Sequence, residues 1–133
     1  MGFKAATAQF IVICAALLPA GVVHSQSKPV ELVGFGDSLM AGYQLPPTES
    51  YTAQLEAALR KKGMNVAVAN AGVSGDTTAG GLARADWSVP DGTDGVILEL
   101  GANDALRGVS PDETEKNLDQ IIAGFKKRNI PVL

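Results

Sequence analysis

Cysteine and histidine are almost absent from this sequence of 133 residues, which has one of each, Cys14 and His24. Both lie in an apolar amino-terminal stretch with the features of a removable export signal. Without that stretch no cysteine remains, so the rest of the chain needs no disulfide bonds. No histidine remains either, which removes the side chain that most often acts as a general base near neutral pH.

The amino-terminal stretch, residues 1–25, is predicted to be a secretory signal peptide. Lys4 is its only charged residue, Phe10–Val23 is largely apolar, and Ser25 is a small residue suited to cleavage. A proline and a glycine interrupt the apolar run, so a retained membrane anchor is the lesser alternative. We therefore expect an exported protein, periplasmic or secreted, in which residues 26–133 belong to a single domain.

A basic surface is also lacking. The sequence has 11 basic and 14 acidic residues, a formal net charge of −3. Domains that bind nucleic acid usually gather basic residues on one face, and this chain shows no such pattern. We expect no nucleic-acid partner.

Short apolar runs alternate with amphipathic segments along the rest of the chain. Strands are predicted at Val30–Phe35, Met64–Ala69 and Val96–Leu100, and a fourth begins at Ile130–Leu133. Strands that alternate with helices imply right-handed crossovers and a parallel sheet covered on both faces. The predicted fold is a three-layer, flavodoxin-like α/β sheet with strand order 2-1-3-4.

Three helical segments are predicted between these strands. The first would cover the sheet with a stripe of Tyr51, Leu55 and Leu59. The glycine pair Gly80-Gly81 favours only a short or irregular second helix. The third begins with the capping residue Ser110, followed by proline, and is predicted strongly. Its buried face would consist of Leu118, Ile121, Ile122 and Phe125.

Polar, glycine-rich segments follow the first three strands and contain Ser38, Gly75 and Asn103. If the strand order is as predicted, Gly75 and Asn103 lie on either side of Ser38. A serine at a strand tip can act as a nucleophile whose attack creates an oxyanion. The simpler alternative is that Asp37 and Ser38 cap the next helix, while Gly75 and Asn103 serve an ordinary turn and a strand end.

Taken together, these segments resemble the SGNH (GDSL) hydrolases. The matching stretches are GDSLMAGY at 36–43, NAGVSGDTTAGGLAR at 70–84 and ELGANDALRG at 99–108, followed by SPDETEKNL at 110–118. Within the family they resemble the exported group of acyl-CoA thioesterase I, arylesterase and lysophospholipase L1. The resemblance implies a serine hydrolase that acts on small-molecule or lipid acyl esters and thioesters, with no metal or organic cofactor.

The resemblance also implies the roles of the site residues. Ser38 would be the nucleophile, and the oxyanion hole would consist of the Ser38 and Gly75 backbone N–H groups and the Asn103 side-chain amide. Arg84 and Arg107 could contact substrate, although surface ion pairs are the simpler interpretation. The charged residues that remain are Glu99, expected to be partly buried with an unidentified partner, and Asp37, Asp76 and Asp104, expected to bind nearby backbone N–H groups.

The chain departs from the family in one respect. SGNH enzymes take their base from a histidine in a carboxyl-terminal Asp-x-x-His block, which is absent here. Serine is a weak nucleophile without a base. We therefore expect the chain to be inactive alone, poorly soluble, and the amino-terminal part of a longer hydrolase.

Two alternatives to a hydrolase stay open. A histidine-free module of the same fold could bind acyl or glycan ligands without turnover. A nucleotide-binding α/β domain is the weaker alternative, because Leu39 stands where the dinucleotide fingerprint needs its third glycine.

Overall fold

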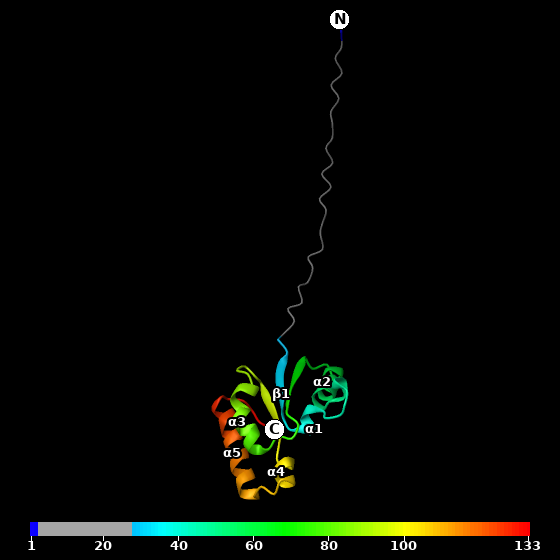
Figure 1. Cartoon of the computed structure of the whole chain (residues 1–133). Coiled ribbons are helices and arrows are strands. Elements are labelled where there is room, and N and C mark those ends of the chain that lie inside the picture. The colour runs from blue at the N-terminus through cyan, green and yellow to red at the C-terminus, as the bar shows by residue number, and fades with distance from the viewer. Residues whose placement is uncertain (3–27) are drawn as a thin grey trace.

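The computed structural model describes residues 1–2 and 28–133, so nearly all of the predicted signal peptide lies outside the described residues. A parallel sheet lies between two groups of helices (Figure 1). In the described ranges, no helix combines the length and the hydropathy needed to span a bilayer. The elements are β1 (Val30–Gly36), α1 (Ser38–Ala41), the 3-10 helix η1 (Pro47–Glu49), α2 (Tyr51–Lys61), β2 (Val66–Gly72), α3 (Thr78–Ser88), β3 (Gly95–Glu99), α4 (Ala102–Leu106) and α5 (Pro111–Lys127).

The sheet has the predicted strand order. β1 lies in the middle and pairs in parallel with β2 and β3. Val132 forms a parallel bridge to Val96 on the outer side of β3, where the fourth strand was expected. Gly36 pairs with Gly72 on one side and with Glu99 on the other, so the three strands end at the same level. The loops that follow them therefore meet at one edge.

β2 continues further than the sequence pattern predicts. It includes Asn70 and Gly72, which were assigned to a polar loop. The Asn70 side chain accepts a hydrogen bond from the Gly72 N–H at 2.9 Å and donates one to the Met40 carbonyl at 3.0 Å. A polar residue is stable in this edge strand because its side chain binds the strand's own backbone and the end of α1.

α3 is a regular helix of 11 residues, so the prediction of a short or irregular segment was wrong. Thr77 caps it by accepting a hydrogen bond from the Gly80 N–H at 3.3 Å. Gly81 faces the sheet, where a Cβ would collide with Cδ1 of Leu100. The glycine that weakens the helix locally is what allows the helix to lie this close to the sheet.

The main apolar core lies between the sheet and the helices α3 and α5 (Figure 1). Phe35 on β1 and Phe125 on α5 are both fully buried and meet edge to face, with ring centroids 5.8 Å apart. Such aromatic pairs add stability beyond the area they bury. The other buried members of the core are Val33, Ala85, Val89, Val96, Ile121 and Ile130.

On the opposite face, α1 and α2 approach the sheet over small residues. A Cβ at Gly34 would overlap both Met40 Sδ and Thr52 Cγ2, so glycine leaves the space that these side chains fill. Thr52 is the fully buried residue of α2, whereas Tyr51 is 49% exposed. The predicted burial of Tyr51 was therefore wrong, because the close approach of α2 leaves room only for a small side chain.

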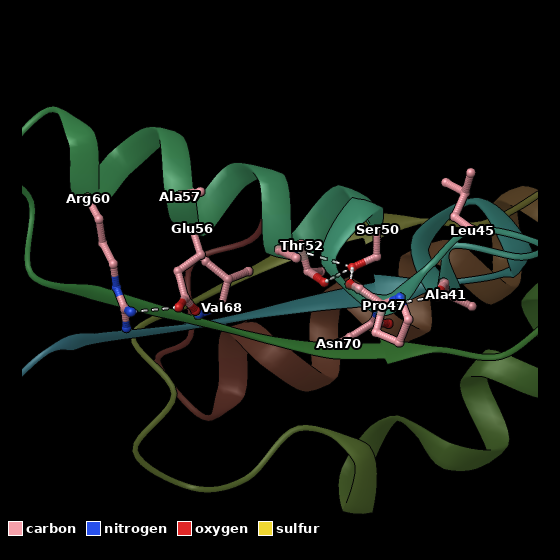
Figure 2. A pocket seen from close by; sticks show the side chains of 11 residues that line it. Ala41, Leu45, Pro47, Ser50, Thr52, Glu56, Ala57, Arg60, Val68 and Asn70 are labelled. Atoms are coloured by element: carbon pink, nitrogen blue, oxygen red, sulfur yellow. Dashed lines mark hydrogen bonds and ion pairs between the residues drawn. The ribbon is translucent and has the colours of Figure 1, made fainter.

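A groove of about 610 Å³ separates α2 from the outer edge of β2 (Figure 2). Glu56 reaches across it and accepts a hydrogen bond from the Val68 N–H at 2.8 Å. Arg60 donates to the Val66 carbonyl at 2.8 Å and pairs with Glu56 at 2.9 Å. Unpaired groups on an edge strand can pair with another chain. Glu56 and Arg60 therefore hydrogen-bond the N–H and carbonyl groups of β2 with which a strand of another chain would otherwise pair.

We expect Glu56→Ala to increase self-association of the protein, because it exposes the Val68 N–H at the sheet edge. The lost hydrogen bond should also lower the free energy of unfolding by about 1 kcal/mol. Light scattering after size exclusion and chemical denaturation measure the two effects. Glu115→Ala, at an exposed position of α5, is the matched control. Equal association of the two variants would contradict the protective role of Glu56.

Candidate active site

Ser38 is the first residue of α1 and lies two residues beyond the end of β1. Asp37 caps the helix: its buried carboxylate accepts a hydrogen bond from the Leu39 N–H at 2.9 Å. Ser38 is half-buried, and no described residue hydrogen-bonds its Oγ. The capping role considered for both residues therefore belongs to Asp37, and the Ser38 hydroxyl is available for chemistry.

Asn103 lies in α4, directly after β3, and its side chain reaches the turn before Ser38. Asn103 Nδ2 donates a hydrogen bond to Asp37 Oδ2 at 2.9 Å. An amide nitrogen carries two hydrogens, so this bond fixes the orientation of the group and leaves one donor for another acceptor. Asp37 thus links the turn before Ser38 to Asn103 across 66 positions of sequence.

Gly75 lies in the loop between β2 and α3 with a φ of +82°, a conformation that favours glycine. The loop begins beside β1, because the Val73 N–H donates to the Gly36 carbonyl at 3.0 Å. Arg107 Nη2 donates to the Gly75 carbonyl at 2.7 Å. Arg107 was expected to form a surface ion pair, but its partner among the described residues is this backbone carbonyl and not a carboxylate, so that interpretation was wrong. Its exposed guanidinium fixes one side of the Gly75 peptide.

Two acidic residues, the buried Asp104 and the half-buried Asp76, connect the loops below the site. Asp104 accepts hydrogen bonds from the Thr78 N–H at 2.8 Å and from Thr78 Oγ1 at 2.5 Å. This confirms the expectation that Asp104 binds a nearby backbone N–H and ties α4 to the start of α3. Asp76 instead pairs with Arg84 Nε at 2.7 Å. The expected ion pair of Arg84 is thus confirmed, but its expected place at the surface was wrong, because Arg84 is only 7% exposed.

Glu99, the last residue of β3, lies against the turn before Ser38. Its Oε2 accepts a hydrogen bond from the Asp37 N–H at 3.4 Å. Burial raises the pKa of the Glu99 carboxyl, and the nearby Asp37 carboxylate raises it further. A negative charge at Glu99 is therefore less favourable in the folded protein than in the unfolded chain.

We expect Glu99→Gln to stabilise the protein relative to wild type increasingly as the pH rises. Because the pKa of Glu99 is raised on folding, its contribution to stability is complete below about pH 4.3, the ordinary value for glutamate, and is lost as the pH rises through the folded value. Glutamine carries no charge at any pH, so the variant does not lose this stability as the pH rises. Thermal melts between pH 4 and pH 7 measure the difference, with Glu115→Gln as the surface control. A difference that does not grow with pH would contradict the assignment.

An apolar hollow of about 220 Å³ lies beside α1 and the end of β3. Leu39 and Met40, which follow Ser38 in α1, form part of its wall. Such a hollow suits an apolar group of a ligand. Its lining residues are Leu39, Met40, Tyr51, Ile97 and Glu99.

The site offers a nucleophile and hydrogen-bond donors but lacks a histidine base, since the sequence has no histidine after His24. In the part of the chain that the structure describes, no three histidine, cysteine or acidic side chains group to hold a metal ion. The strand ends and loop contacts described above place the Ser38 turn, the Gly75 loop and Asn103 at one edge of the sheet.

Sequence reasoning missed two parts of the site. The first is the link from Asp37 to Asn103, for which the sequence carries no signal. The second is the buried role of Arg84. Its spacing of eight residues after Asp76 could have indicated that the two meet across the first turns of α3.

Comparisons with known proteins agree with this geometry. Residues 35–133 match the GDSL-like lipase/acylhydrolase family. An arylesterase of Vibrio mimicus is 45% identical over 97 residues, covering 72% of this chain and 48% of the relative. The thioesterase 1/protease 1/lysophospholipase L1 of Escherichia coli K12 is 39% identical over 99 residues, covering 74% and 46%.

A solved structure is similar to this chain in fold and in sequence. AlinE4, an SGNH-hydrolase family esterase, superposes with a TM-score of 0.77 at 50% identity, covering 81% of this chain and 59% of that chain. The chain spans about half the length of the curated relatives it matches.

Proposed function

This chain belongs to the GDSL-like lipase/acylhydrolase family of serine ester hydrolases, and on that premise we propose that it supplies the nucleophile and the oxyanion hole of an enzyme that hydrolyses carboxylic esters or thioesters. The observation that carries the proposal is the bidentate use of Asp37. One carboxylate oxygen binds the Leu39 N–H that follows Ser38, and the other binds the Asn103 amide. A single buried side chain thereby links the backbone of the Ser38 turn to a side-chain donor.

In the proposed reaction, Ser38 Oγ bonds to the carbonyl carbon of the substrate while its proton passes to a base. The carbonyl oxygen becomes an oxyanion that accepts hydrogen bonds from the Ser38 and Gly75 N–H groups and the Asn103 amide. Expulsion of the alcohol or thiol, which takes up the proton, leaves an acyl-enzyme. Water then hydrolyses the acyl-enzyme, releasing the acid and restoring Ser38.

The base is the part that residues 26–133 do not supply, because they contain no histidine. We propose that it belongs to another part of the complete protein, placed within hydrogen-bond reach of Ser38 Oγ. By itself the described segment would bind and orient an acyl group with little turnover.

The proposed substrates have an apolar acyl group joined to an aryl alcohol, a thiol or a glycerophosphate headgroup. The apolar hollow next to Leu39 and Met40 supports an acyl group of this kind. The names of the two curated relatives describe the same three substrate classes. We further propose that residues 1–25 direct export to the periplasm or beyond, on the strength of their single charge and apolar run.

The test uses the product of the complete gene that encodes this chain. It is assayed with short p-nitrophenyl esters and with an acyl-CoA, and is treated with a fluorophosphonate that forms a stable adduct on activated serine. Turnover together with an adduct mapped to Ser38 would support the proposal. Turnover with the adduct elsewhere would overturn the role of Ser38 and point to another nucleophile. Neither turnover nor adduct would overturn the proposal and favour the histidine-free binding module.

A further inference from the structure

Arg84 is buried and donates several hydrogen bonds to the loops of the site, unlike an arginine that serves only as a surface cation. It lies on α3 and is buried, with its guanidinium carbon 4.1 Å from the centroid of the Phe35 ring. Each of its three nitrogens donates to an acceptor. The contacts are Nε to Asp76 Oδ2 at 2.7 Å, Nη1 to the Ala71 carbonyl at 2.8 Å and to Ser88 Oγ at 3.3 Å, and Nη2 to the Gly36 carbonyl at 2.9 Å.

These acceptors belong to both segments that carry the backbone donors of the proposed oxyanion hole. Gly36 lies two residues before Ser38, and Asp76 directly follows Gly75. The Ala71 carbonyl lies near the end of β2, where the Gly75 loop begins. One side chain therefore binds the backbone before the nucleophile and the residue after the second donor.

The chemistry of the guanidinium makes this link rigid. It is planar, always charged, and presents its N–H groups in a fixed fork, so binding three acceptors also fixes the spacing between them. The Phe35 ring supports its face, and burial removes the competing water. A lysine ammonium at the same position keeps the charge but has no fixed fork.

We propose that Arg84 is a positioning residue that sets the separation between the Ser38 and Gly75 N–H groups, and through it the fit of the oxyanion. The inference rests on the proposed function, because it assumes that the two groups act on one oxygen. It assigns Arg84 no contact with substrate. Its effect passes through the backbone at Gly36 and through Asp76.

The test compares Arg84→Lys with Arg128→Lys in the product of the complete gene. Arg128 makes chemically similar contacts, donating to the Val89 carbonyl at 2.6 Å and to Asp91 at 2.9 Å, but these residues precede β3, at the opposite end of the sheet. We expect Arg84→Lys to lower kcat by about 10-fold to 10²-fold with KM changed less than about 3-fold, because misplacement of aligned groups affects the transition state most. Arg128→Lys should retain the wild-type kcat.

Asp76→Asn is the second variant, in case Arg84→Lys does not fold. It weakens the link to the Gly75 loop while Arg84 keeps its bonds to the Gly36 and Ala71 carbonyls. We expect a loss of kcat in the same direction, again with little change in KM. A wild-type kcat in Asp76→Asn, or an equal loss of kcat in Arg128→Lys, would overturn the positioning role.

Hydrogen exchange separates this inference from the proposed function. In Arg84→Lys, the amides of residues 73–77 should exchange faster, whereas those of Val89 and Asp91 should not. If the complete protein hydrolyses no ester, the proposed function fails, yet faster exchange at 73–77 would still support the link made by Arg84. Unchanged exchange and kcat would overturn the link while leaving the hydrolase intact.

Discussion

Ser38→Ala is expected to lower kcat for p-nitrophenyl ester hydrolysis by the complete protein by about 10⁶-fold, the loss seen when a catalytic serine is removed from a serine hydrolase. The reason is chemical, because in the proposed reaction Oγ is the atom that bonds to the acyl carbon. The fold should not change, since no described residue hydrogen-bonds this hydroxyl. Steady-state kinetics and a thermal melt on the same preparation measure the two effects.

Ser110→Ala is the matched control for this experiment. Ser110 caps α5 by accepting a hydrogen bond from the Glu113 N–H at 3.2 Å, away from the Ser38 turn. Its loss should cost about 1 kcal/mol of stability and leave kcat unchanged. A Ser38→Ala variant that keeps a tenth of the wild-type kcat would show that another residue is the nucleophile.

The strands and their parallel direction could be predicted because the signals are local, and their order followed from assuming a flavodoxin-like sheet. Each strand is a short apolar run that ends in glycine or polar residues, and the intervening helix signals leave only parallel crossovers. The end of β2 could not be predicted, because Asn70 and Gly72 have the composition of a loop. Only the contact of Asn70 with Met40, 30 positions away, shows why the strand continues.

The helix α3 illustrates a conflict between local propensity and tertiary packing. Glycine costs about 1 kcal/mol relative to alanine within a helix, so Gly80-Gly81 argued against a regular helix. The compensating contacts come from Asp104, which binds the Thr78 N–H, and from Leu100, against which Gly81 packs. Both partners lie about 20 or more positions further along the chain, beyond the range of any local pattern.

The same limit applies to the site. That the segments with Ser38, Gly75 and Asn103 meet could be predicted, because strand tips in a parallel sheet share an edge, whereas the roles proposed for them come from the family resemblance. The contacts that organise them could not, because Asp37 meets Asn103 and Arg84 meets Gly36 across 66 and 48 positions. Sequence pattern thus predicts which segments meet at the sheet edge, and the structure shows which buried side chains link them.

Asn103→Ala should lower kcat by about 10²-fold to 10³-fold, with KM changed only a few-fold, because the lost amide would stabilise the oxyanion and not the substrate's ground state. The substitution also leaves Asp37 Oδ2 without its donor. Asn117→Ala is the control: this buried amide on α5 donates to Thr78 Oγ1 at 3.1 Å and supports the same loops without reaching Asp37. It should lower stability and leave kcat unchanged.

Combining Asn103→Ala with Ser38→Ala distinguishes the two interpretations of Asn103. If the amide acts on an oxyanion created by Ser38, removing it should have little further effect once that serine is gone, because residues that act as a unit are not additive. If Asn103 only caps the strand end, its loss should lower the melting temperature equally in both backgrounds and leave kcat of the single variant near wild type. An unchanged kcat in Asn103→Ala would therefore remove the side-chain donor from the oxyanion hole and leave Ser38 and Gly75 as its only members among the residues proposed here.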